Sequence, residues 1–144
     1  MIATVRNGLL PFLARLLLIA EFAIALNGKI QGWQGQEAYM AAHRLKLVAP
    51  LLAAALAIEL VGCVCLLLGV QARRAATMLC LYLGVVSLCL HDFWNMSGMA
   101  AGANQTQFFK NLGIMGGLLL IALHGPGSWA LQRERAFAVA HDWK

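Results

Sequence analysis

The stretch that decides the fold runs from residue 47 to residue 74 and reads LVAPLLAAALAIELVGCVCLLLGVQARR. It holds a single charged residue, Glu59, before the basic pair Arg73 and Arg74. A transmembrane helix needs about 20 mainly apolar residues to cross a hydrocarbon core of about 30 Å, and basic residues are typical of the ends of such helices. The sequence therefore predicts a membrane-spanning helix over residues 48–70, followed by a tight basic turn.

Three further apolar runs, at about 9–26, 75–94 and 108–123, have the same character. Hydrophobic residues make up 61% of the 144-residue chain, charged residues only 12%, and the mean hydropathy is +0.73. Because ordinary soluble domains carry about 25% charged residues, the apolar faces must meet lipid. We predict an all-α fold, an integral membrane four-helix bundle forming a single domain over residues 1–144.

The two longer connections differ in character. Residues 37–43 read EAYMAAH and predict a short amphipathic helix at the membrane interface in the first outer loop. Residues 95–107 are polar and small, and are predicted to form a loop. No small-x-small cleavage site follows Leu26, so the first run is expected to stay in the membrane.

The net charge of +5 reflects basic residues at the ends of apolar runs, which argues against a nucleic-acid partner. With four spans, both termini and the basic turn share one side of the membrane. The positive-inside rule then predicts cytoplasmic termini from the basic residues on that side: Arg6, Arg73, Arg74, Arg133, Arg135 and Lys144.

Charged residues inside apolar runs cost about 2.5–3.5 kcal/mol each on insertion scales, so they usually face the bundle and have a partner. Glu59 shares a helical stripe with Gly62, Cys63, Leu66 and Gly69. We therefore predict that Glu59 faces the bundle interior. Its expected partners are Lys110, His91, Asn111 or Arg15.

Two interpretations of Glu59 stay open. It is either a structural carboxylate that holds the bundle together or a proton-transfer or ligand-binding group in apolar surroundings. Glu21 lies at a similar depth, so two carboxylates are expected to share the core. On the third helix Cys80, Gly84, Ser87 and His91 form a second inward stripe, and Gly113 and Gly117 are candidates for close helix approach on the fourth.

His91 and Asp92 end the third predicted helix, as a hydrated interfacial pair or as a proton relay or quinone contact. Glu21, Glu59 and His91 lack a Glu-x-x-His or His-x-x-x-His spacing, so no metal site is predicted.

The four cysteines lie within helices and form no Cys-x-x-Cys motif. We interpret them as small buried hydrophobic residues. Cys63 and Cys80 lie at similar distances from the basic turn, which predicts close Cα atoms without a disulfide, and leaves a redox dithiol as the alternative.

Several short stretches together resemble the DoxX family of four-helix membrane proteins. They are Arg15 with Lys29, the segments 40–43 (MAAH), 58–62 (IELVG) and 68–69 (LG) followed by Arg73, and the segments 91–94 (HDFW), 107–112 (QFFKNL) and 125–128 (GPGS). The chain departs from that family at Ala25-Leu26, where a Ser-Gly pair is common, and at Glu21.

The resemblance implies a bacterial inner-membrane protein associated with a membrane redox system. The leading hypothesis is an accessory subunit that binds a quinone, or docks an oxidoreductase partner or a second copy of itself. Glu59, His91, Lys110 and Asn111 would line its polar centre, supported by Arg15 and Lys29. The alternative is a non-enzymatic assembly factor or chaperone, and a transporter is a third. No covalently bound cofactor is expected, because no haem or dinucleotide motif is present.

Overall fold

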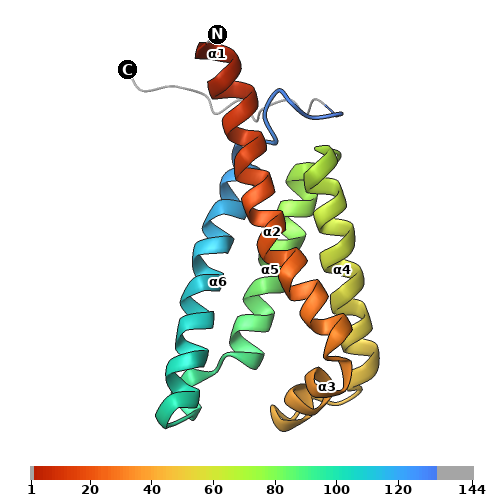
Figure 1. Ribbon diagram of the computed structural model, residues 1–144, viewed down its shortest axis with the longest axis vertical. Helices are drawn as coiled ribbons and strands as arrows, with labels where there is room; N and C mark the ends of the chain where they lie inside the picture. Colours follow the sequence, from red (N-terminus) through yellow and green to blue (C-terminus); the bar gives the residue numbers. More distant parts are fainter. Residues whose placement is uncertain (1, 133–144) are drawn as a thin grey trace.

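The computed structural model describes residues 2–132, in which long helices run side by side as a bundle (Figure 1). All the regular secondary structure in the described part of the chain is helical, with no β-strand. In chain order the elements are α1 (Ile2–Thr4), the π-helical turn η1 (Val5–Leu9), α2 (Leu10–Gln31), α3 (Trp33–Ala42), α4 (Val48–Leu68), α5 (Ala72–Leu90), the 3₁₀ turn η2 (Phe93–Asn95) and α6 (Gly98–His124).

Four stretches are long and apolar enough to cross a membrane, which confirms the predicted all-α membrane bundle. They are Ile2–Gln31, Val48–Leu68, Ala72–Asn95 and Gly98–His124. The short helix predicted in the first connection is also present, as α3. In Figure 1 it lies at the end of the bundle opposite the N-terminus, beneath the end of α2 and beside α4.

The helix ends differ from the sequence prediction. The first helical stretch starts at Ile2 and continues to Gln31, so Lys29 lies in its last turn instead of in a loop. The fourth helix starts at Gly98 instead of near 108, so most of the predicted loop at 95–107 is helical. Hydropathy marks where the chain meets hydrocarbon, whereas the helical backbone continues into the polar region, and this is why both helices were predicted too short.

Small residues set the spacing between neighbouring helices. A Cβ on Gly62 of α4 would lie 2.6 Å from the Leu79 side chain of α5, and one on Gly117 of α6 would lie 3.1 Å from Leu18 of α2. Gly113 instead faces open space, so only Gly117 of the predicted pair allows a close approach. All five members of the predicted α4 stripe are buried. The core between α2, α4, α5 and α6 includes Phe22, Cys63, Leu66, Leu79, Leu83 and Leu118.

The connection between α4 and α5 is made by residues 69–71, not by the two arginines. Gly69 adopts φ +66° and Gln71 φ +47°, and Arg73 and Arg74 then lie in the first turn of α5. Arg73 donates hydrogen bonds to the carbonyls of Ala122 (2.8 Å) and Leu123 (2.6 Å) in the last turn of α6. A cation at this position satisfies free carbonyls and the negative end of the helix dipole.

The segment after α6 returns to the start of the chain. The predicted stop at Gly125-Pro126-Gly127 is present, and the backbone N–H and hydroxyl of Ser128 both donate to the carbonyl of Asn7, at 2.7 and 3.0 Å. The N-terminus, the α4–α5 turn and residue 132 therefore share one end of the bundle, which we call the terminal end. The opposite end, with α3 and the α5–α6 connection, is the α3 end (Figure 1). Arg133, Arg135 and Lys144 lie outside the described residues.

Candidate functional site

A cavity of about 300 Å³ opens in the half of the bundle nearest α3. All five large helices contribute to its wall, with most of the lining from α2, α5 and α6. Phe22, Leu83, Val86 and Ile114 form an apolar wall, while two lysines, two glutamates, a histidine and several amides supply polar groups. Mixed walls of this kind are typical of ligand sites.

The deepest charged group of the cavity is the carboxylate of Glu59, which is 2% exposed. The Lys29 Nζ lies 2.7 Å from its Oε1 and 2.9 Å from its Oε2, and the Tyr82 hydroxyl donates to Oε1 at 2.6 Å. Because a buried unpaired carboxylate is very costly in low dielectric, this triad is what allows a charge at this depth.

The prediction that Glu59 faces the bundle interior is confirmed, but its predicted partners were wrong. Lys29 and Tyr82 hold it in place of Lys110, His91, Asn111 or Arg15. The partner was missed because α2 extends to Gln31, which brings Lys29 back along the bundle wall to the depth of Glu59.

A second ion pair lies at the rim. Lys110 Nζ of α6 is 3.4 Å from Glu21 Oε2 of α2, and both side chains are 43% exposed. The pair bridges the two helices that frame the cavity on one side. Glu21 and Glu59 line the same cavity, but the prediction that both carboxylates lie in the core was wrong, because only Glu59 is buried and Glu21 lies at the rim with its own lysine.

Below the rim, the buried Asn111 donates from Nδ2 to the Ser87 hydroxyl at 3.0 Å, and Ser87 donates to the Leu83 carbonyl at 2.7 Å. This chain of hydrogen bonds satisfies the side chains that join α5 to α6. Asn111 also lines the cavity, as predicted.

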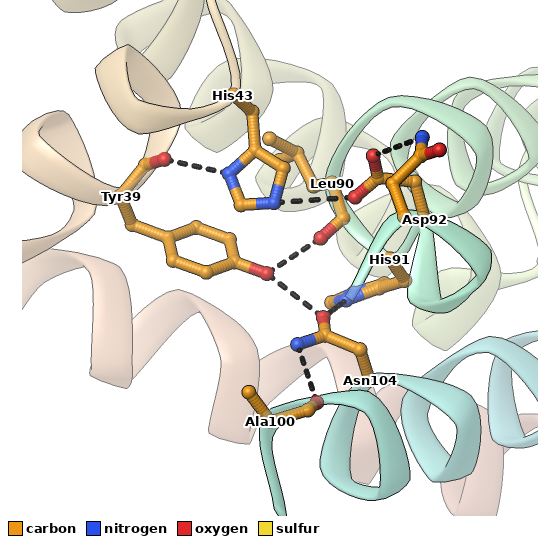
Figure 2. A network of polar contacts seen from close by, with 8 residues as sticks. Tyr39, His43, Leu90, His91, Asp92, Ala100 and Asn104 are labelled. Atoms are coloured by element: carbon orange, nitrogen blue, oxygen red, sulfur yellow. Dashed lines mark hydrogen bonds and ion pairs between the residues drawn. The ribbon is translucent and has the colours of Figure 1, made fainter. Parts of the chain in front are cut away.

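A third polar cluster connects α3 to the ends of α5 and α6 (Figure 2). The Tyr39 hydroxyl lies 2.5 Å from the Leu90 carbonyl and 2.9 Å from Asn104 Oδ1, and His91 Nδ1 lies 3.0 Å from the same Asn104 oxygen. Burial, and secondarily the negative charge of Asp92, raises the pKa of the Tyr39 phenol. Tyr39 is therefore a neutral hydrogen-bond donor at neutral pH.

His91 and Asp92 do not form the pair that the sequence suggested. Asp92 accepts a hydrogen bond from Asn95 at 2.9 Å, and its Oδ1 lies 3.4 Å from His43 Nε2, which makes an ion pair when His43 is protonated (Figure 2). His91 turns instead toward Asn104 and the cavity. Asn104 was missed because its segment was interpreted as a loop.

Arg15 is the predicted site residue that lies elsewhere. It is 1% exposed, and its guanidinium donates to the carbonyls of Leu66 (2.7 Å) and Leu67 (3.3 Å), and to that of Trp129. Its place at the polar centre was therefore wrong. It closes the C-terminal turn of α4 at the terminal end, as Arg73 does for α6.

The other five predicted residues, Glu59, His91, Lys110, Asn111 and Lys29, all line the cavity. Residues 2–132 contain no group of three or more His, Cys, Asp or Glu side chains that could hold a metal. All four cysteines are free thiols, and Cys63 and Cys80 are buried in the same apolar core. The close approach of their Cα atoms stays a prediction.

The fold defines a polytopic helical membrane protein, with a cavity lined by charged side chains in the half of the bundle nearest α3. The chain belongs to the SURF4 family, whose sequence model matches residues 48–136, more than half of its length. It is 34% identical to the inner membrane protein YphA of Escherichia coli K12 over 127 residues, 87% of this chain and 89% of that protein. It is 33% identical to the inner membrane protein YqjF of the same organism over 121 residues, 83% of this chain and 87% of that protein.

The chain is also similar to eukaryotic proteins. The ER-derived vesicles protein ERV29 of Saccharomyces cerevisiae is 27% identical over 78 residues, 54% of this chain and 25% of that protein. No solved structure matches the chain.

The resemblance to the DoxX family is thereby corrected, because the family match is to SURF4. The short stretches that carried it, such as a glutamate followed by a glycine in an apolar run or a basic pair after a span, are general requirements of small helical membrane bundles. They identify the architecture but not the family.

Proposed function

We propose that this chain is a non-enzymatic factor of the bacterial inner membrane. It holds a client molecule by reversible contact in the charged cavity and so assists the assembly or trafficking of membrane components. The observation that carries this proposal is the mutual pairing of the cavity's charged groups.

Lys29 is bound to Glu59, Lys110 to Glu21, and His91 to Asn104. Catalysis of proton or group transfer needs a base or nucleophile aimed at the reacting atom. In the described part of the chain, the cavity's charged side chains are instead aimed at one another. Such an arrangement favours a ligand that is bound and released unchanged.

The relatives support the same interpretation. YphA and YqjF are named as inner membrane proteins, and ERV29 is named for vesicles derived from the endoplasmic reticulum. Assembly and trafficking are functions that a membrane protein in either setting could share, whereas a redox function has no support among these relatives.

Quinone binding is the second candidate, and one contact favours it. His91 lines the cavity and donates from Nδ1 to the Asn104 oxygen, which leaves Nε2 to accept a hydrogen bond from a quinol hydroxyl. Under this alternative the chain would still serve a redox partner, alone or as a homo-oligomer.

The experiment purifies the full chain in mild detergent and identifies the lipids, quinones and polypeptides that remain bound. Glu59→Gln is compared with Glu37→Gln, a matched change on α3 outside the cavity. We expect a client in stoichiometric amount with the unmodified chain and with the Glu37 variant, lost from the Glu59 variant. Quinol oxidation that depends on Glu59, or the absence of any client, would contradict the proposal.

The orientation belongs to the proposal as well. The terminal end carries Arg6, Arg73 and Arg74, so we place both termini in the cytoplasm and the α3 end outside. A reporter active only in the periplasm, fused after Lys144, should stay inactive. Activity of that fusion would invert the topology.

A further inference from the structure

We propose that the cavity binds the headgroup of a zwitterionic phospholipid, with its phosphate held by Lys110 and Lys29 and its ammonium group by Glu21. This inference rests on the proposed function, because it names the class of client that the cavity holds. The client would be taken directly from the membrane leaflet at the α3 end.

The depth of the cavity along α6 suits a lipid headgroup. The 27 residues of α6 extend over about 40 Å, which exceeds the hydrocarbon thickness of about 30 Å. Its first six residues are small and apolar, and its next turn is polar, with Asn104, Gln105, Thr106 and Gln107. Lys110 lies one turn deeper than Gln107, and a long lysine side chain extends from such a depth toward the headgroups, so the rim of the cavity is within reach of lipid phosphates.

The charges on the cavity wall are balanced. Two lysines and two glutamates line the cavity, so their formal charges cancel. A ligand of net charge would leave an uncompensated charge in a low-dielectric site, which is costly. A zwitterionic headgroup carries one positive and one negative charge, so its binding leaves the net charge of the cavity at zero. Its two charged groups can replace the contact between Lys110 and Glu21, because the 3.4 Å separation of that pair is long for a charged hydrogen bond.

The cavity wall has unused hydrogen-bonding capacity. Lys29 directs two contacts to Glu59, which leaves one of its three N–H groups. The side-chain amides of Gln36 and Gln107 line the cavity and form no hydrogen bond with other described residues. These donors suit the several acceptor oxygens of a phosphodiester.

The size of the cavity and its opening toward lipid also suit a headgroup. A volume of about 300 Å³ is at the lower end of the range of about 300–1,000 Å³ for ligand pockets. It holds a headgroup, while the acyl chains must remain in the bilayer. Ile24 lines the cavity and is 70% exposed, so the wall on this side is continuous with the lipid-facing surface along which acyl chains would lie.

A polypeptide segment fits this opening less well. An extended backbone that entered from the side would expose N–H and C=O groups to hydrocarbon. A lipid brings only its polar headgroup to the site and leaves its apolar part where it already was.

The test offers the purified full chain equal amounts of phosphatidylethanolamine and phosphatidylglycerol and measures the retained lipid by native mass spectrometry. We expect at least a tenfold preference for phosphatidylethanolamine. Lys110→Gln and Glu21→Gln should each reduce its retention about tenfold, whereas Lys46→Gln, an exposed lysine near the α3 end but outside the cavity, should not.

A phosphatidylethanolamine with a photoreactive headgroup gives a readout on the unmodified chain, which removes any dependence on folding of the variants. Its crosslinks should fall on the cavity-lining residues of α2 and α6. Equal retention of the two lipids, retention unaffected by Lys110→Gln, or crosslinks scattered over the lipid-facing helices would overturn the inference. So would displacement by soluble glycerophosphoethanolamine at the same concentration, which would make the ligand a soluble molecule.

The two proposals fail separately. If a polypeptide or an unreacted quinone is the client that Glu59→Gln releases, the binding function stands and the lipid inference falls. If the chain oxidises quinol in a Glu59-dependent way, the binding function itself falls.

Discussion

The two ends of the bundle use their cations in opposite ways. At the terminal end, Arg15 and Arg73 donate to backbone carbonyls in the last turns of α4 and α6. At the α3 end, Lys29 and Lys110 pair with the carboxylates of Glu59 and Glu21 around a cavity of about 300 Å³. The first arrangement closes helix ends, and the second surrounds a space.

This difference separates structural charges from candidate functional ones. A backbone carbonyl is fixed by its helix, so an arginine bound to it has no alternative partner to exchange. A carboxylate on a side chain can rotate, and a lysine can release it to a ligand. The predictions below test whether stability resides at the terminal end and ligand binding at the α3 end.

The largest effect is expected for Arg15→Met, which keeps much of the side-chain volume but removes the charge. Three carbonyls lose a charged hydrogen bond, which destabilises the fold by about 1.5–3 kcal/mol each. Removal of the charge offsets part of this loss, because a charge within the membrane costs about 2.5–3.5 kcal/mol. We expect a net loss of about 3 kcal/mol, measured by unfolding in detergent. Arg6→Met, at an exposed arginine, is the control and should change stability by less than about 0.5 kcal/mol.

Glu59→Leu should cost about 2 kcal/mol, because it leaves the Lys29 ammonium without its partner. The expected cost is below the usual 3–5 kcal/mol for breaking a buried pair, since Lys29 is 18% exposed and can reach water. The double variant Lys29→Met with Glu59→Leu should recover to within about 1 kcal/mol of the unmodified chain. A double variant as unstable as the single one would show that the pair itself stabilises the fold, as Arg15 does.

Tyr39→Phe should cost about 1 kcal/mol at pH 8, the value of one hydrogen bond. The pKa of the phenol is raised in the folded state above its ordinary value of 10.0. The unfolded chain therefore loses this proton first as pH rises, so the contribution is full below pH 10 and declines above it. The difference in stability between the two chains should shrink between pH 8 and pH 11, and a constant difference would contradict the Tyr39 contact.

The smallest effect on stability is expected at the rim. Lys110→Gln and Glu21→Gln should each change it by no more than about 0.5 kcal/mol, because half-exposed ion pairs contribute little. The same variants should release the client. A loss of several kcal/mol in either would make the rim a structural element and remove the contrast between the two ends.

Hydropathy predicted the number of spans, and helical periodicity with the cost of a charge in the membrane predicted the inward stripe of α4. Hydropathy did not predict the helix ends, since residues 98–107 are small and polar yet helical. Lys29 reaches Glu59 because α2 continues as a helix beyond its apolar run, and no local sequence pattern predicts how far the helix continues. The carbonyl acceptors of Arg15 could not be predicted from the sequence either, because every residue has a carbonyl and only the fold brings three of them to Arg15.

Arg15 also imposes an order on biosynthesis. Its acceptors at Leu66 and Trp129 follow it by 51 and 114 residues. At about 5–20 residues per second, the ribosome supplies the first after about 3–10 s and the second after about 6–23 s. During that interval the first helix holds an arginine whose acceptors have not yet been made. We therefore expect the nascent chain to keep this helix near the translocon or a water-filled groove until α4 supplies the first of these acceptors.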